Sequence, residues 1–170
     1  MGAKKVLVLD VDETLLNLEP LFFLKRFKKN YKEYEGTLIF NKYYISPRPN
    51  VKEFLEKAKE HFDLVAFSVV EKEFTKQKLK KLGMLDYFSK IYGKESLIDG
   101  KKVLNIIAND LNKDVKNIII IDDKPNSVAE QDSVIGISPW FIGSDKNDAE
   151  LMEIFDKLLK VNIIEVSSWQ

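Results

Sequence analysis

The chain has 170 residues, of which 45% are hydrophobic, a length and composition typical of one domain built around a single core. Its 27 basic and 27 acidic residues cancel, so no overall field would attract nucleic acid or an anionic membrane, and we expect neither as a partner. The absence of cysteine excludes disulfides, thiolate nucleophiles and cysteine-ligated zinc, and favours an intracellular protein.

The start of the chain and its apolar runs argue against export and against membrane insertion. Only the apolar run Val6 to Leu9 precedes Asp10, which is too short for a signal sequence, and no run approaches the length of a membrane span. We therefore expect a cytoplasmic protein without a membrane partner.

The first predicted element is a strand over Val6 to Leu9, because a continuous apolar run is typical of a strand covered on both faces. The stretch 17–47 then breaks the pattern. Apolar and aromatic residues between Phe23 and Tyr34 predict a helix, Gly36 predicts a turn, and the β-prone run Thr37 to Ile45 predicts a hairpin. We interpret 17–47 as a small insertion into one domain, since no linker or internal repeat divides the chain.

Helices and strands alternate through the rest of the chain. Apolar residues at helical spacing predict helices over 51–62, 104–111 and 151–159, the last with a cap at Asn147 or Asp148. Apolar runs predict strands over 64–67, 118–121 and 134–137, with a weaker candidate at 88–92. The alternation predicts right-handed βαβ units and a layered α/β domain, in which ligands bind beyond the carboxyl ends of the strands.

Acidic residues follow two of the predicted strands directly. Asp10 and Asp12 come after the first strand, with Thr14 at the next alternate position, and Asp122 and Asp123 end a later one. Adjacent strands would gather these carboxylates, and like charges held close are costly unless a cation needs them. Magnesium prefers hard oxygen ligands and leaves positions for water and phosphate. The alternative is that the acids merely cap helices or turns.

Ser68 ends the apolar run 64–67, so its hydroxyl could donate to a phosphoryl oxygen at the same edge of the sheet. A serine at a strand end is also ordinary without any function, and the position alone leaves both interpretations open.

The order of these residues resembles the four motifs of the haloacid dehalogenase superfamily: 6–15, then Ser68, then a lysine, then Asp122 with Asp123. Within that superfamily the chain is most similar to the small phosphatases acting on the RNA polymerase carboxyl-terminal domain, the branch that includes NLI-interacting-factor-like proteins. The similarity extends through 48–55, 118–125, 138–141, 144–145 and 148–151. Ser68 stands where that branch usually has threonine, and Asp123 where it often has asparagine.

The resemblance implies a three-layer Rossmann-like α/β domain over 1–170, with a central mainly parallel sheet and 17–47 as a minimal cap. It implies that Asp10 is a nucleophile that forms an aspartyl-phosphate, that Asp12 is the acid and base, and that Thr14 helps to hold the loop. The implied magnesium ligands are an Asp10 oxygen, the Asp12 main-chain carbonyl and Asp122, with Asp123 acting directly or through water.

The resemblance also implies residues that contact the phosphoryl group and the substrate. Ser68 and a lysine would neutralise the phosphoryl oxygens. Lys101 and Lys102 both precede the predicted helix 104–111, and the pattern of the branch selects Lys102. Further substrate contacts are expected from Val69, Arg48 and Trp140, although Trp140 could instead cover the edge of the sheet.

The expected activity is magnesium-dependent hydrolysis of a phosphomonoester. An insertion of about thirty residues supplies only a small lid, and an open crevice would admit phosphoserine or phosphothreonine in a protein. Small metabolites, sugar phosphates and nucleotides would also fit, and a phosphotransferase or a non-catalytic phospho-ligand binding module remain as alternatives.

The segment 25–32 is basic with interleaved aromatic residues, and it could bind an anionic polymer. We favour the alternative that it is a solvated helix face whose aromatic side chains enter the core.

Overall fold

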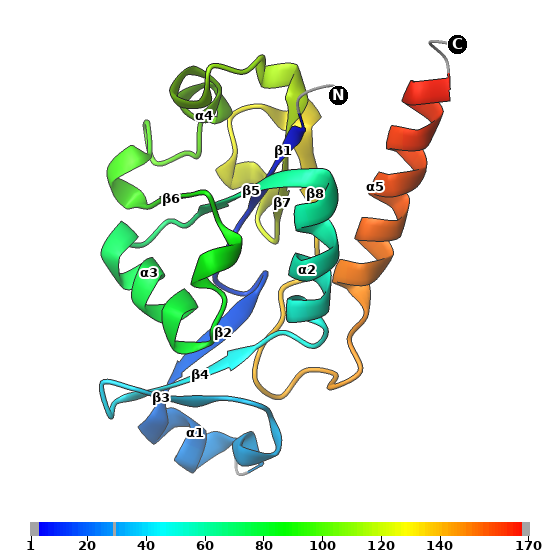
Figure 1. The fold of residues 1–170 in the computed structure, drawn as a ribbon. Coiled ribbons are helices and arrows are strands. Elements are labelled where there is room, and N and C mark those ends of the chain that lie inside the picture. The colour runs from blue at the N-terminus through cyan, green and yellow to red at the C-terminus, as the bar shows by residue number, and fades with distance from the viewer. Residues whose placement is uncertain (1–3, 29, 168–170) are drawn as a thin grey trace.

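The computed structural model describes residues 4–28 and 30–167, with side chains as far as Val161. Its centre is a five-stranded parallel sheet in the order β6-β5-β1-β7-β8 (Figure 1). The strands are β1 (Lys5–Leu9), β5 (Phe62–Phe67), β6 (Lys90–Tyr92), β7 (Ile118–Asp122) and β8 (Val134–Gly136). All five coincide with the apolar runs that predict strands, which confirms the parallel α/β sheet.

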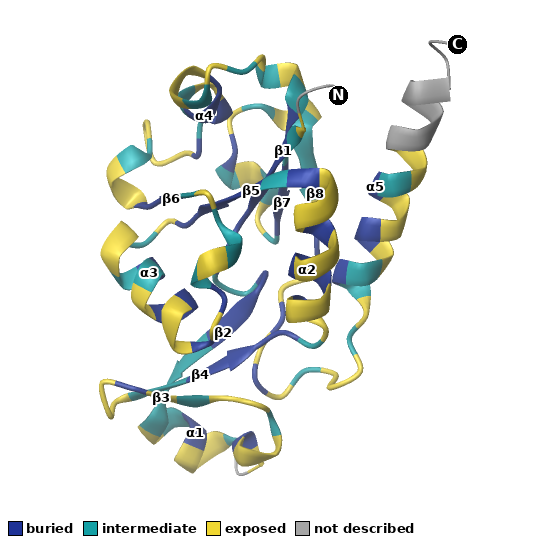
Figure 2. Ribbon diagram, in the orientation of Figure 1, coloured by how far each residue is buried: buried dark blue, intermediate teal, exposed yellow. Residues whose placement is uncertain are grey.

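Helices cover both faces of this sheet and give it two cores. Alternate residues of β1 point to opposite faces, so that Leu7 and Leu9 join one buried cluster and Val6 and Val8 join the other. The first cluster contains residues of α2 (Val51–His61), α3 (Lys72–Lys81) and α5 (Glu150–Ser167), and the second contains residues of α4 (Leu104–Leu111). Figure 2 shows the central strands buried and the outer helix faces exposed.

The helix α3 is absent from the sequence-based prediction because its apolar stripe is weak. Seven of its ten residues are charged or amide residues, at 72–73, 76–78 and 80–81, and its buried residues are Thr75, Lys78 and Leu79. The described loops also contain single 3₁₀ turns: η1 (Tyr31–Glu33), η2 (Leu85–Tyr87), η3 (Lys94–Ser96), η4 (Val115–Asn117), η5 (Pro125–Ser127) and η6 (Gln131–Ser133).

The insertion forms a second, antiparallel sheet in the order β2-β4-β3. Its elements are β2 (Leu16–Pro20), α1 (Leu21–Phe27), β3 (Thr37–Ile39) and β4 (Tyr43–Pro47). The predicted hairpin is confirmed as β3 and β4, while the strand β2 was not predicted and the helix ends at Phe27, earlier than its pattern suggested. Since β2 follows the loop after β1, the insertion lies beyond the carboxyl ends of the parallel strands (Figure 1).

The segment 137–149, between β8 and α5, runs back across the insertion. The Trp140 N–H donates to Glu13 O at 2.8 Å, and the Ile142 N–H donates to the Asn17 side-chain oxygen at 3.0 Å. The predicted cap at Asn147 or Asp148 is wrong, because α5 begins at Glu150. The Asp148 carboxylate instead bonds the Arg48 guanidinium.

No helix in the described part of the chain combines the length and the apolar composition that crossing a bilayer requires.

Candidate active site

Asp10 stands at the carboxyl end of β1, the middle strand of the parallel sheet. Its N–H donates to Ile121 O at 3.0 Å, which continues the pairing of β1 with β7 by one residue. This register places Asp10 level with Asp122 at the end of β7. The Asp10 residue is 5% exposed and Asp122 is 1% exposed, so both carboxyl groups lie below the surface.

Three carboxylates converge at this edge of the sheet. One oxygen each from Asp10, Asp122 and Asp123 lie within 4.8 Å of one another. Thr14 Oγ1 lies 2.9 Å from Asp10 Oδ2 and accepts a hydrogen bond from the Asp123 N–H at 3.2 Å. The hydroxyl therefore links the loop after β1 to the loop after β7, and it is fully buried.

One of the three carboxylates keeps an unsatisfied atom. Asp123 Oδ2 is buried and has no hydrogen-bond partner, and Lys124 Nζ lies 3.9 Å away. A buried polar oxygen without a partner is costly and calls for an explanation, such as a bound ion.

Lys102 is the cation that this acidic cluster contains. Its Nζ bonds Asp10 Oδ1 and lies 2.7 Å from Asp122 Oδ2, and its side chain is 1% exposed. Burial lowers the pKa of Lys102, but Asp10 and Asp122 outweigh that effect and raise the pKa overall. The neighbouring Lys101 is exposed.

Burial raises the pKa of Asp10 well above its ordinary value, Lys102 opposes the shift, and the Asp122 charge adds to it. The metal-free site therefore disfavours a full set of ionised carboxylates. A divalent cation would relieve this cost.

Asp12 lies at the same edge but bonds a different set of groups. Ser68 Oγ donates to Asp12 Oδ2 at 3.1 Å, and Lys78 Nζ bonds Asp12 Oδ1. The Asp12 side chain is 21% exposed, which leaves it open to solvent and to a ligand. Ser68 itself is buried, while the adjacent Val69 is 46% exposed.

Two residues near these carboxylates, Lys78 and Glu13, were not predicted from the sequence. Lys78 was overlooked because α3 was not predicted, although a lysine on the buried side of a helix is a signal in itself. Glu13 has a left-handed φ of 61°, which is uncommon for a residue with a side chain. Burial, then the Asp12 charge, raise the pKa of Glu13.

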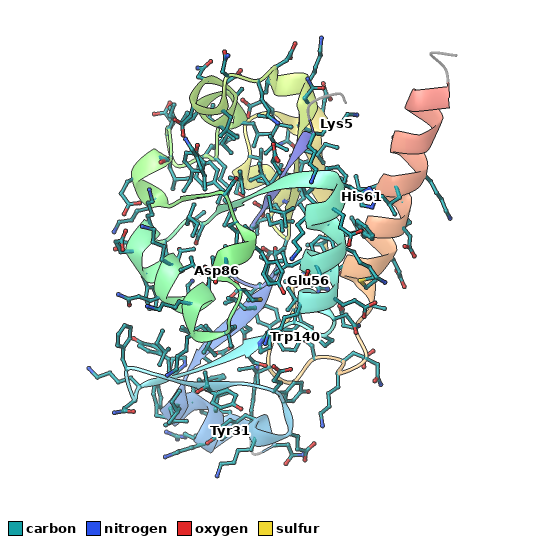
Figure 3. The ribbon with its side chains drawn as sticks, in the orientation of Figure 1. Lys5, Tyr31, Glu56, His61, Asp86 and Trp140 are labelled. Carbon is teal, nitrogen blue, oxygen red and sulfur yellow. The ribbon has the colours of Figure 1, made fainter. Side chains whose placement is uncertain are left out.

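Arg48 and Trp140, which were expected to contact the substrate, both have protein partners in the structure. The Arg48 side chain is fully buried, and its guanidinium donates to Asp148, Glu150 and Ser138 O at 2.8 to 3.0 Å. Trp140, which is labelled in Figure 3, is 2% exposed, and its Nε1–H donates to Asp145 O. Both polar groups are therefore bonded within the protein, and a contact of either side chain with the substrate stays a prediction.

The basic segment 25–32 was expected to be a solvated helix face with its aromatic side chains in the core, and the structure agrees only in part. Tyr31 is buried, but Phe27 is 61% exposed. Lys28 Nζ bonds Ile142 O, and Lys29 lies outside the described residues.

Comparisons with known proteins assign the chain to a family. The model of the NLI interacting factor-like phosphatase family matches residues 5–169. The chain belongs to this family. A relative from Dictyostelium discoideum, CTD small phosphatase-like protein 2, is 31% identical to the chain, and the match covers 94% of the chain. The chain covers 28% of that relative's length.

Solved structures give this NLI interacting factor-like chain the fold of the haloacid dehalogenase superfamily. A variant of the fission yeast RNA polymerase II CTD phosphatase Fcp1 bound to beryllium fluoride superposes with a TM-score of 0.64 and 17% identity. The match covers 93% of the chain and 50% of that structure. A haloacid dehalogenase-like hydrolase from Streptococcus pneumoniae superposes with a TM-score of 0.56 and 15% identity, over 88% and 90% of the two chains.

Proposed function

We propose that this chain is a magnesium-dependent phosphomonoester hydrolase in which Asp10 forms an aspartyl-phosphate. The observation that carries the proposal is the convergence of the Asp10, Asp122 and Asp123 carboxylates beside a buried oxygen that has no hydrogen-bond partner. Membership of the NLI interacting factor-like phosphatase family supports it.

The residues present fit a magnesium ion. Asp10, Asp122 and Asp123 offer hard oxygen atoms, the ligand type that magnesium prefers, and the unsatisfied Asp123 Oδ2 is available for direct or water-mediated contact. The Asp12 main-chain carbonyl completes the proposed ligand set. Bound there, the ion would polarise a phosphoryl oxygen and offset the repulsion between the carboxylates.

The proposed reaction has two steps on this chain's own carboxyl groups. An Asp10 oxygen attacks phosphorus in line, the bond to the ester oxygen breaks, and Asp12 gives that oxygen its proton. Asp12 then takes a proton from water, whose oxygen attacks the phosphorus of the aspartyl-phosphate. Phosphate leaves, Asp10 is restored as a carboxylate, and Asp12 is again protonated.

Other residues would orient these two acids and neutralise charge. Thr14 holds Asp10 and the loop of Asp123, as its hydrogen bonds indicate. Lys102 reaches two carboxylates of the site and would also face the phosphoryl oxygens, where a fixed positive charge stabilises the transition state. The Ser68 hydroxyl and the exposed Val69 would border the bound phosphoryl group.

The proposed substrate is phosphoserine or phosphothreonine in a protein. The insertion is small, and Asp12 stays partly exposed beside it, so a bulky substrate can reach the site. Relatives whose names describe them as CTD phosphatases agree with a protein substrate. Hydrolysis or transfer of the phosphate of a small metabolite, a sugar or a nucleotide is the second candidate, because the same open site admits them.

A substrate panel tests the proposal. The chain is assayed with p-nitrophenyl phosphate, phosphopeptides, sugar phosphates and nucleotides, each with and without magnesium. We expect hydrolysis only with magnesium, no turnover by a folded Asp10→Asn variant, and wild-type activity for Asp86→Asn, whose carboxyl group is exposed in η2. Turnover by Asp10→Asn would rule out the nucleophile, and binding of phosphopeptides without hydrolysis of any ester would indicate a binding module.

A further inference from the structure

Lys78 is a buried cation beside the candidate active site, and the reaction proposed above gives it no role. Of the residues that the structure describes, two lysines are buried, Lys102 and Lys78, and each bonds an aspartate of the site. A buried ammonium group is costly unless it is paired. The partner of Lys78 is Asp12 Oδ1.

The direction of Lys78 is unusual for its helix. The first residue of α3 and its last turn carry lysines that are exposed to solvent: Lys72, Lys80 and Lys81. Lys78 instead lies on the buried side with Thr75 and Leu79, and its side chain is 1% exposed. An apolar residue at this position would avoid the desolvation of a charge, so the contact with Asp12 is what the lysine adds.

The insertion contacts Phe74, an aromatic neighbour of Lys78. Its Nζ lies 5.1 Å from the centre of the Phe74 ring, which is also on α3. The Phe74 ring stacks on Phe40 at the tip of the β3–β4 hairpin, with 6.1 Å between the ring centres. The hairpin, α3 and the loop after β1 thus form one contiguous set of contacts that ends at Asp12.

Two donors together restrain the Asp12 side chain. Lys78 bonds one carboxylate oxygen, and Ser68 Oγ donates to the other at 3.1 Å. A carboxyl group that exchanges protons with a substrate must be held close to its productive geometry, because small displacements cost much of the rate. Asp12 is partly exposed and would otherwise be free to rotate.

We propose that Lys78 is a positioning residue, which holds the Asp12 carboxyl group in the orientation from which it exchanges a proton with the leaving oxygen and then with water. The inference rests on the proposed function, since Lys78 acts only through Asp12. Lys102, by contrast, bonds Asp10 and Asp122 and not Asp12. Loss of Lys78 therefore impairs proton transfer more than nucleophilic attack.

The test compares two esters that differ in their need for a proton. Phenyl phosphate releases a poor leaving group that depends on the proton from Asp12, whereas p-nitrophenyl phosphate releases a stable phenolate. We expect Lys78→Met to lower kcat/KM for phenyl phosphate about tenfold more than for p-nitrophenyl phosphate. Lys78→Arg, which keeps a cation able to pair with a carboxylate, retains most of the wild-type ratio between the esters.

Matched variants separate this effect from loss of structure. Lys76→Met removes a half-exposed lysine of the same helix that pairs with Glu73, and it leaves the ratio unchanged. Thermal unfolding checks that each variant is folded. If Lys78→Met does not fold, Lys78→Gln replaces it, and we expect the same larger loss of kcat/KM on phenyl phosphate. An equal loss of activity on both esters overturns the inference. If the wild-type chain hydrolyses neither ester, the proposed function is overturned, and this inference with it.

Discussion

At the scale of the residue, the burial of two adjacent lysines separates their roles. Lys101 and Lys102 precede α4 together, but only Lys102 points into the acidic cluster. The Lys102 N–H donates to Ser127 O at 2.8 Å, and its carbonyl accepts from the Ala129 N–H at 2.9 Å. These backbone bonds attach it to the loop after β7, which directs its side chain toward Asp10 and Asp122.

This difference gives a prediction for a matched pair of variants. Lys102→Met removes a buried charge from the proposed phosphoryl site, and we expect kcat/KM for p-nitrophenyl phosphate to fall by about a hundredfold or more. Lys101→Met removes an exposed charge one residue away and stays close to wild type. Circular dichroism establishes that both variants are folded. A loss of activity with Lys101→Met alone would show that the other lysine faces the substrate.

At the scale of the element, Arg48 joins the insertion to the last helix. It follows β4 directly, and its guanidinium pairs with Asp148 and Glu150 around the start of α5. It also donates to Ser138 O at 2.9 Å, so it holds both ends of the segment 137–149. Because that segment bonds Glu13 through Trp140, Arg48 supports the loop that carries Asp12.

We expect Arg48→Met to lower the free energy of unfolding by about 3 kcal/mol, since it leaves two mostly buried carboxylates without their partner. Urea denaturation measures the change, and amide hydrogen exchange should accelerate across 137–149. Lys52→Met is the matched control, because Lys52 is half exposed and lies 3.8 Å from Glu35. Its effect should stay below about 0.5 kcal/mol. Equal effects of the two variants would contradict the role given to Arg48.

At the scale of the whole molecule, the acidic cluster links stability to pH and to metal. The folded protein raises the pKa of Asp10, so it binds this proton more tightly than the unfolded chain does. Stability of the metal-free protein therefore falls as the pH rises from the ordinary Asp pKa through the raised pKa of Asp10. A bound cation opposes this loss by stabilising the ionised carboxylates.

Magnesium should consequently raise the thermal unfolding temperature, and more so at neutral pH than in mild acid. At a concentration a hundred times the dissociation constant, the stabilisation is about 2.7 kcal/mol. Differential scanning calorimetry with magnesium and then EDTA measures the effect and its reversal. Asp122→Asn should abolish the shift, whereas Asp86→Asn should preserve it. A shift that persists in Asp122→Asn would place the cation elsewhere.

Much of the fold and of the acidic site could be predicted from the sequence because the signals are local. An apolar run such as 118–121 marks a buried strand by its own composition, and an acid directly after it must lie at the edge of the sheet. Asp10, Asp122 and Asp123 were expected together for this reason, and they lie together in the structure. The hairpin of the insertion was likewise visible in its own residues.

The sequence by itself therefore determined the parallel sheet and the acids at its edge. Only the tertiary structure decided which long, flexible side chains turn inward. Lys102 rather than Lys101, Lys78 beside Asp12, and the buried positions of Arg48 and Trp140 all depend on partners distant in the chain. The physical reason is that a lysine or arginine is stable in either environment, and a partner supplied by another element decides between them.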